Sequence, residues 1–92
     1  MIGYAECEFR LYNCQSLKEK RAVLQKVITR CKQKFNISIA EMDHQDRWQL
    51  TSIGLVTISS SKKVAEKELN QAIQFLDSFP EWERTITNFE WL

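Results

Sequence analysis

The sequence predicts an α+β domain in which four strands and two helices follow one another in the order βαββαβ. Three observations predict it. Residues 2–12 alternate in polarity, two later segments have the apolar spacing of amphipathic helices, and residues 37–42 and 51–59 are strand-like runs. Gly3, Gly54 and Pro80 are the only glycines and proline among 92 residues. We expect a single domain over residues 1–92, because chains of this length rarely divide.

The first strand and the first helix are the clearest elements. The inward face of the predicted strand has Ala5, Cys7, Phe9 and Leu11, and its outward face has Tyr4, Glu6, Glu8 and Arg10. Ser16 and Glu19 have the spacing of a capping box, in which the serine hydroxyl accepts the N3 amide and the glutamate reaches back. The helix is therefore expected to begin there and to end at about Lys34, where basic residues complement the helix dipole.

The remaining elements are predicted from shorter stretches of sequence. Residues 37–42 form a β-branched run, residues 43–48 a polar turn, and residues 51–59 a third strand. Gly54 inside that strand predicts a bulge or a close backbone approach. The second helix is expected to start after Ser60 or Ser61 and to stop at Pro80. A last strand then carries Trp82, Ile86, Phe89 and Trp91.

This order predicts a ferredoxin-like sandwich, in which both helices cover one face of an antiparallel sheet with strand order 4-1-3-2. One end should collect the start of the first helix and the turns at 43–48 and 79–82. The other end should collect the close of the first helix and the start of the second. The helical faces place Leu24, Ile28, Cys31, Leu69, Ile73 and Leu76 in the core.

Three stretches of the sequence also resemble a known family. They are SLKEKR at 16–21, FNISIAE at 35–41, and DHQD at 43–46 followed by WQ at 48–49. With the N-terminal strand, they are similar to the YlxP-like family of small bacterial proteins over nearly the whole chain. The resemblance implies a ferredoxin-like fold and a gene among those for translation and ribosome maturation, beside initiation factor two and ribosome-binding factor A. It implies no molecular activity, because the function of that family is uncharacterised.

Composition narrows the classes of function. No segment approaches the roughly 20 apolar residues of a membrane span, and the N-terminus lacks the pattern of a signal peptide, so a cytoplasmic protein without membrane contact is expected. Cys7, Cys14 and Cys31 lack the spacing of a disulfide framework or a zinc site. We expect no cofactor and no metal. Cys14 lies near basic residues in the turn before the first helix, but no histidine base is evident beside it.

An enzyme is the least favoured interpretation. The only histidine, His44, is flanked by Asp43 and Asp46, a combination that can bind a metal or transfer a proton. There is no second histidine, and hydrogen-bonded turn residues explain the cluster more simply. A small enzyme built on the 43–48 turn remains a low alternative, and no catalytic residue is assigned.

Charge points to the candidate contact surfaces. Residues 16–35 hold seven basic residues against Glu19 alone, which gives +6, whereas the whole chain is +1 and the remainder therefore −5. Lysines in the first turn of the second helix oppose its dipole unless an anion binds there. The predicted phosphate contact comprises Arg30, Lys32, Lys34, Ser60, Ser61, Lys62 and Lys63. The alternative contact end comprises Lys18, Lys20, Arg21, Asp43, His44, Asp46, Arg47 and Trp48. An ordinary solvated helix face is the simpler explanation of the same charges.

The leading hypothesis is a non-enzymatic accessory domain of ribosome assembly or translation that contacts ribosomal RNA by charge and shape. The alternative is a protein–protein module that binds a ribosome-maturation or translation factor, with a homodimer as one form of it. Tyr4 and part of the set Trp82, Phe89 and Trp91 would supply an outward apolar patch for self-association. RNA binding on the sheet face is disfavoured, because Glu6 and Glu8 repel phosphate there.

Overall fold

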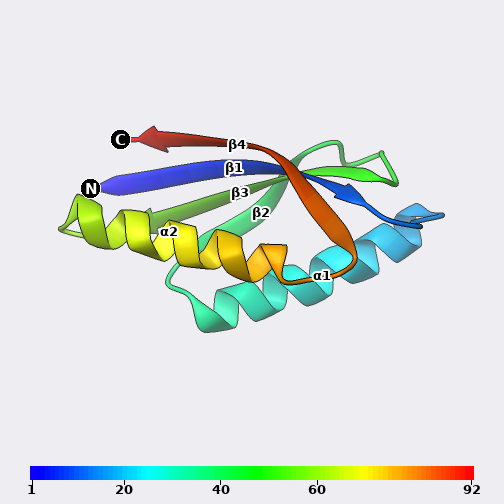
Figure 1. Ribbon diagram of the computed structural model, residues 1–92, viewed down its shortest axis with the longest axis horizontal. Helices are drawn as coiled ribbons and strands as arrows, with labels where there is room; N and C mark the ends of the chain where they lie inside the picture. The colour runs from blue at the N-terminus through cyan, green and yellow to red at the C-terminus, as the bar shows by residue number, and fades with distance from the viewer.

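The computed structural model describes residues 1–92 and shows an antiparallel sheet covered on one face by two helices (Figure 1). The elements are β1 (Ile2–Leu11), α1 (Leu17–Lys34), β2 (Ser38–Asp43), β3 (Leu50–Ile58), α2 (Lys62–Asp77) and β4 (Trp82–Trp91). The strand order is β2-β3-β1-β4, which is the expected order 4-1-3-2 counted from the opposite edge. The predicted ferredoxin-like α+β fold is confirmed.

Strand β1 lies in the middle of the sheet, antiparallel to β3 on one side and to β4 on the other. Its inward residues Ala5, Cys7 and Phe9 are fully buried beneath the helices, as the alternation predicts. Burial raises the pKa of the Cys7 thiol, which is filling the core as a small apolar group. The opposite face of the sheet has no helix over it (Figure 1).

Both helices start at the predicted serines. The Ser16 hydroxyl accepts a hydrogen bond from the Glu19 amide at 3.1 Å, and the Ser61 hydroxyl accepts one from the Val64 amide at 3.3 Å. The Glu19 carboxylate accepts from the Gln15 amide at 2.7 Å, one residue before the position that a capping box predicts. These side chains satisfy helical amides that have no partner within the helix.

The core prediction is confirmed at every position except Ile28, which is only partly buried. Val27 is fully buried in its place. Val27 follows Leu24 by three residues and precedes Cys31 by four, so these three side chains lie on one line of the helix. Ile28 lies one residue farther round the helix, at the margin of the buried face.

The aromatic residues of β4 lie on the helix side of the sheet, so the predicted outward apolar patch is wrong. The Trp82 ring stacks on Phe9 at 4.0 Å between centroids, and its indole nitrogen donates to the Leu76 carbonyl at 2.8 Å. Phe89 and Trp91 pair with Ala5 and Gly3, so they too lie on the helix side. A bulge opposite Glu8 and Phe9 shifts the register, and with it the side-chain face of the strand. Of the four residues in that prediction, only Tyr4 lies on the open face.

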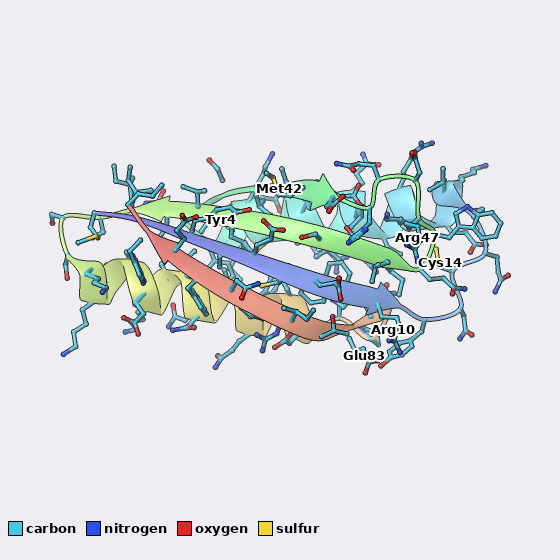
Figure 2. All side chains as sticks on the ribbon, turned by 90° about the horizontal axis from the view of Figure 1, so that it is seen from above. Tyr4, Arg10, Cys14, Met42, Arg47 and Glu83 are labelled. Carbon is cyan, nitrogen blue, oxygen red and sulfur yellow. The ribbon has the colours of Figure 1, made fainter.

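Gly54 marks a close approach of side chains. A Cβ atom there would lie 2.6 Å from the Met42 Cγ and 2.9 Å from the Tyr4 hydroxyl. Tyr4 and Met42 belong to the open face, where Figure 2 labels them. Burial, together with a 2.6 Å hydrogen bond to Glu6, raises the pKa of Tyr4 to about 12. There is no bulge at Gly54, and the register shifts between Glu41 and Asp43 instead.

Replacing Leu24 with alanine should lower the free energy of unfolding by roughly 2–5 kcal/mol, because the cavity forms in a close-packed core. Val64→Ala is the control, since Val64 is 58% exposed on α2 and its loss should cost less than about 0.5 kcal/mol. Urea denaturation followed by circular dichroism measures both variants. Equal stabilities for the two would contradict the core assignment.

Candidate functional site

Three phenylalanine rings line the junction between α1 and α2. Phe35 and Phe75 meet edge to face at 5.6 Å between ring centroids, and Phe75 and Phe79 meet in the same way at 5.3 Å. Phe79 is buried, whereas Phe35 and Phe75 are only partly buried. We call these three residues the phenylalanine seam. Its partial exposure leaves ring faces within reach of side chains from α1.

Three cationic side chains of α1 lie over this seam. Lys26, Arg30 and Lys34 are spaced by four residues and therefore share one side of the helix. The Lys26 ammonium and the Arg30 guanidinium lie 5.6 and 6.0 Å from the Phe79 centroid, and the Lys34 ammonium lies 4.8 Å from that of Phe75. Each distance is within the range of a cation–π contact. We call these three residues the cation row.

The members of the cation row differ in their ionic partners. Lys26 forms an ion pair with Glu81 and lowers the pKa of that carboxyl group. Arg30 and Lys34 have no carboxylate within ion-pair distance. Their charges are thus oriented by the rings and available to an anion. The sequence analysis found Arg30 and Lys34 but not Lys26 or the seam, although the four-residue spacing was a visible signal.

The structure separates the predicted phosphate contact into two places. The Lys34 ammonium lies over Phe75, which is 13 residues after Lys62 and so about 20 Å farther along α2. The Ser61 hydroxyl is occupied as the cap of α2, and the Lys62 ammonium lies 5.3 Å from the Trp91 ring centroid. The prediction that all seven residues form one cluster is therefore wrong.

The cause of this separation is the stagger of the two helices. The Asn36 amide, just beyond the end of α1, donates to the Glu68 carboxylate at 2.8 Å, in the middle of α2. Figure 1 shows α1 displaced along the length of the molecule relative to α2. Arg30, Lys32 and Lys34 consequently accompany the C-terminal half of α2, whereas Lys62 and Lys63 lie near the C-terminus of β4.

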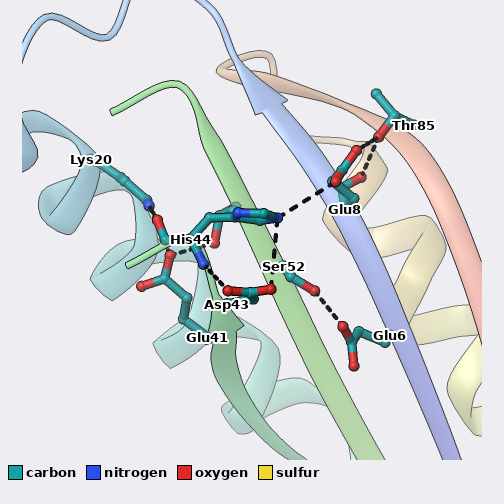
Figure 3. Close-up of polar contacts among 9 residues, drawn as sticks. Glu6, Glu8, Lys20, Glu41, Asp43, His44, Ser52 and Thr85 are labelled. Carbon is teal, nitrogen blue, oxygen red and sulfur yellow. Dashed lines mark hydrogen bonds and ion pairs between the residues drawn. The ribbon is translucent and has the colours of Figure 1, made fainter. Parts of the chain in front are cut away.

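The opposite end of the domain is organised around a buried lysine. Lys20 is 1% exposed, and its ammonium donates to the His44 carbonyl at 2.6 Å and to the Glu41 carboxylate at 2.9 Å (Figure 3). The Thr51 hydroxyl donates to the same carboxylate oxygen at 2.7 Å. Lys20 therefore cannot be a contact residue for a partner, and its place in the alternative contact end is a second correction. It joins α1 to the β2–β3 hairpin.

His44 belongs to a hydrogen-bonded turn. Its backbone has φ 65°, in the left-handed region, and its amide donates to the Asp43 carboxylate at 2.8 Å. The imidazole Nε2 lies 3.7 Å from Glu8 Oε1, whose carboxylate also accepts from the Thr85 hydroxyl at 2.7 Å (Figure 3). No group of three or more histidine, cysteine or acidic residues has a geometry suited to a metal ion. The arrangement fixes the loop conformation.

The outer part of the hairpin is exposed. Arg47 and Trp48 project there, and the indole of Trp48 is 50% exposed. Figure 2 labels Arg47 at the hairpin end of the molecule. A concavity of about 650 Å³ is lined by Glu8, Arg10, Asp46, Arg47, Trp48, Gln49 and Leu50. Lys18 and Arg21 are exposed on the first turns of α1. The structure thus brings the hairpin beside the start of α1, as predicted.

These features define a small ferredoxin-like α+β protein with a basic helix layer. Neither helix is long and apolar enough to cross a membrane. The chain belongs to the family described as "Protein of unknown function (DUF503)", whose model matches residues 2–89. It is 57% identical over 91 residues to the "Uncharacterized protein YlxP" of Bacillus subtilis (strain 168), and the match covers 99% of each chain. The predicted family resemblance is confirmed.

Replacing Lys20 with methionine should lower the free energy of unfolding by roughly 3 kcal/mol. The Glu41 carboxylate and the His44 carbonyl would then lose their buried donor. Lys18→Met removes an exposed charge from the same helix and should change stability by less than about 0.5 kcal/mol. Denaturant unfolding compares the two variants. If Lys20→Met is as stable as the parent, the lysine does not hold the hairpin on α1.

Proposed function

We propose that this protein is a non-enzymatic accessory protein of ribosome assembly or translation that contacts structured RNA through its helix layer. The observation that carries the proposal is the cation row, in which Arg30 and Lys34 are held over the phenylalanine seam without a carboxylate partner. The ribosomal context rests on the family resemblance, and the choice of RNA rests on the surface itself.

The cation row is suited to phosphate groups. Adjacent members are about 6 Å apart along the helix axis, so consecutive charges can meet consecutive phosphates of one strand. The ring contacts restrict the side chains before binding, which reduces the entropy lost when a phosphate is bound. The guanidinium of Arg30 can additionally bind a phosphate through two parallel hydrogen bonds.

The charges on the rest of the surface also favour binding of RNA to the helix layer and not to the open face of the sheet. The open sheet face and its margins carry Glu6, Glu8, Asp43, Glu83 and Glu90. Arg10 is the basic residue of the β1 open face, and its guanidinium lies 3.9 Å from Glu83. The exposed cations of the two helices that have no ion-pair partner are Lys18, Arg21, Arg30, Lys32, Lys34, Lys62, Lys63 and Lys67. Residues 62–77 hold three lysines and three acidic residues, so the positive excess of the helix layer comes from α1, which attracts phosphate, whereas the open face repels it.

The shape of the helix layer favours a duplex or another folded RNA. Structured RNA is recognised largely through its backbone and its overall shape, which requires cations spread over a surface. Only one of the six residues that line the hollow beside the cation row is hydrophobic; they are Ala22, Gln25, Lys26, Thr29, Arg30 and Gln33. Pockets for small molecules are usually lined mostly by hydrophobic and aromatic residues.

A second candidate function uses the hairpin end. Trp48 is half exposed next to Arg47, and tryptophan and arginine are enriched among residues that dominate protein–protein binding. This surface would bind a translation or ribosome-maturation factor. In that case Trp48→Ala should abolish capture of the factor, and nuclease treatment should leave capture by the parent unchanged.

The RNA proposal is tested with two matched double variants. Arg30→Gln with Lys34→Gln neutralises the free part of the cation row. Lys18→Gln with Arg21→Gln removes the same charge from the other end of the same helix. Affinity for ribosomal RNA is measured over a range of salt concentrations. The first variant should bind more weakly, and its plot of log K against log salt should be shallower by nearly two units, because each phosphate contact releases counterions.

The results of these affinity measurements distinguish between the possible RNA-binding surfaces. If both variants lose RNA affinity equally, the contact is spread over the basic residues of α1 and is not specific to the cation row. If neither variant loses affinity, RNA binding through α1 is contradicted. Lys62→Glu with Lys63→Glu tests the start of α2 separately. If that variant alone loses affinity, the contact lies beside β4. Thermal unfolding of each variant confirms that the fold is intact.

A further inference from the structure

The outer edge of β4 is unpaired along the whole strand. β4 pairs only with β1 and is an edge strand of the sheet (Figure 1). β4 exposes two large apolar side chains, with Ile86 55% and Phe89 46% exposed, and Leu92, which directly follows the strand, is 71% exposed. Natural sheets usually protect such an edge with charges or a bulge. The β4 bulge comes before Ile86, and Glu90 is the only charged residue among residues 86–92.

The backbone groups that point outward from this edge can be identified. Ile2 and Leu92 exchange two hydrogen bonds, of 3.3 and 2.9 Å between nitrogen and oxygen. The register then continues without a shift from Gly3 opposite Trp91 to Glu8 opposite Ile86. Hydrogen-bonded pairs alternate along an antiparallel ladder. The N–H and C=O groups of Thr87, Phe89 and Trp91 therefore point away from β1.

We propose that the protein forms a homodimer in which two β4 strands pair antiparallel about a two-fold axis at Phe89. This register places Phe89 opposite Phe89 of the second copy and Ile86 opposite its Leu92. Each exposed apolar side chain of the strand then meets an apolar partner on the same face. Asn88 faces Glu90 of the second copy, so an amide donor meets a carboxylate.

The outward backbone groups fit the same register. Thr87, Phe89 and Trp91 of one copy lie opposite Trp91, Phe89 and Thr87 of the other, and each such pair exchanges two hydrogen bonds. Two adjacent registers also keep side chains on matching faces: one places Glu90 opposite Glu90, so that like charges meet, and the other places Ile86 opposite Glu90. That arrangement packs a carboxylate against an apolar side chain and leaves Phe89 opposite a threonine. The register centred on Phe89 is therefore favoured by both faces of the strand.

A second copy is favoured over a strand of another protein because the edge is complementary to itself. A two-fold contact of this kind closes, whereas a head-to-tail contact would extend into a filament. The other edge of the sheet offers no equivalent site, since β2 has six residues and an irregular register near Asp43. The two-fold axis is perpendicular to the sheet, so both helix layers lie on one side. The dimer does not depend on RNA binding, but it would double the basic surface.

The test measures the mass of the full chain in solution by sedimentation equilibrium, where a dimer has twice the chain mass of 10.9 kDa. Phe89→Lys and Phe89→Glu should each raise the dimer dissociation constant at least about 30-fold, because like charges would meet across the axis. Mixing these two variants should restore a one-to-one dimer. Asn88→Lys adds the same charge one residue away, opposite Glu90, and should leave the dimer intact.

Each outcome decides the proposal. A parent that stays monomeric at high concentration overturns it, as does a dimer that Phe89→Lys does not weaken. A dimer that Asn88→Lys abolishes, or that mixing the two Phe89 variants does not restore, overturns the register. Circular dichroism melts of the single variants show whether each remains folded, and the mixing experiment excludes misfolding as the cause of dissociation.

Discussion

The structure depends on the pairing of β1 with strands on both of its sides. Because β1 is central, its inward residues Ala5, Cys7 and Phe9 have no access to solvent once the helices cover them. α2 packs its apolar face against this strand and its neighbour β3, where Ile53 and Leu55 are also fully buried, and α1 packs against β2. β4 is added at the side of β1, and its inward Trp82 ring completes the core by stacking on Phe9. A change at β1 therefore affects every other element.

Covering only one face of the sheet gives the protein two chemically different surfaces. The open face has to remain in water, and β1 supplies it with Glu6, Glu8 and Arg10 at alternate positions. The helix layer is amphipathic, so its outward positions are free to carry lysine and arginine. The net charge of +1 is the sum of a basic segment at residues 16–35 and an acidic remainder of the chain. The same one-sided arrangement leaves the β4 edge open to a second copy.

Much of the fold followed from local patterns. Alternation in residues 2–12 defined both faces of β1. Ser16 defined the start of α1 and Ser60 or Ser61 that of α2, because capping requires a short side chain with an oxygen acceptor, and the structure places the second cap at Ser61. The strand order followed from the element order, since right-handed crossovers leave few topologies. Helical periodicity identified most of the core. Its error at Ile28 arose because a 3.6-residue period leaves the margin of a buried face undefined.

The amino-acid sequence by itself determined the elements, their order, the family and the basic character of α1, because these properties depend on nearby residues. Only the tertiary structure decided the stagger of α1 against α2, which separates Lys34 from Lys62 and places the cation row over the phenylalanine seam. It also decided that Lys20 is buried, since its partners Glu41 and His44 are more than 20 residues away along the chain. Residues so distant in sequence become neighbours only when the elements pack.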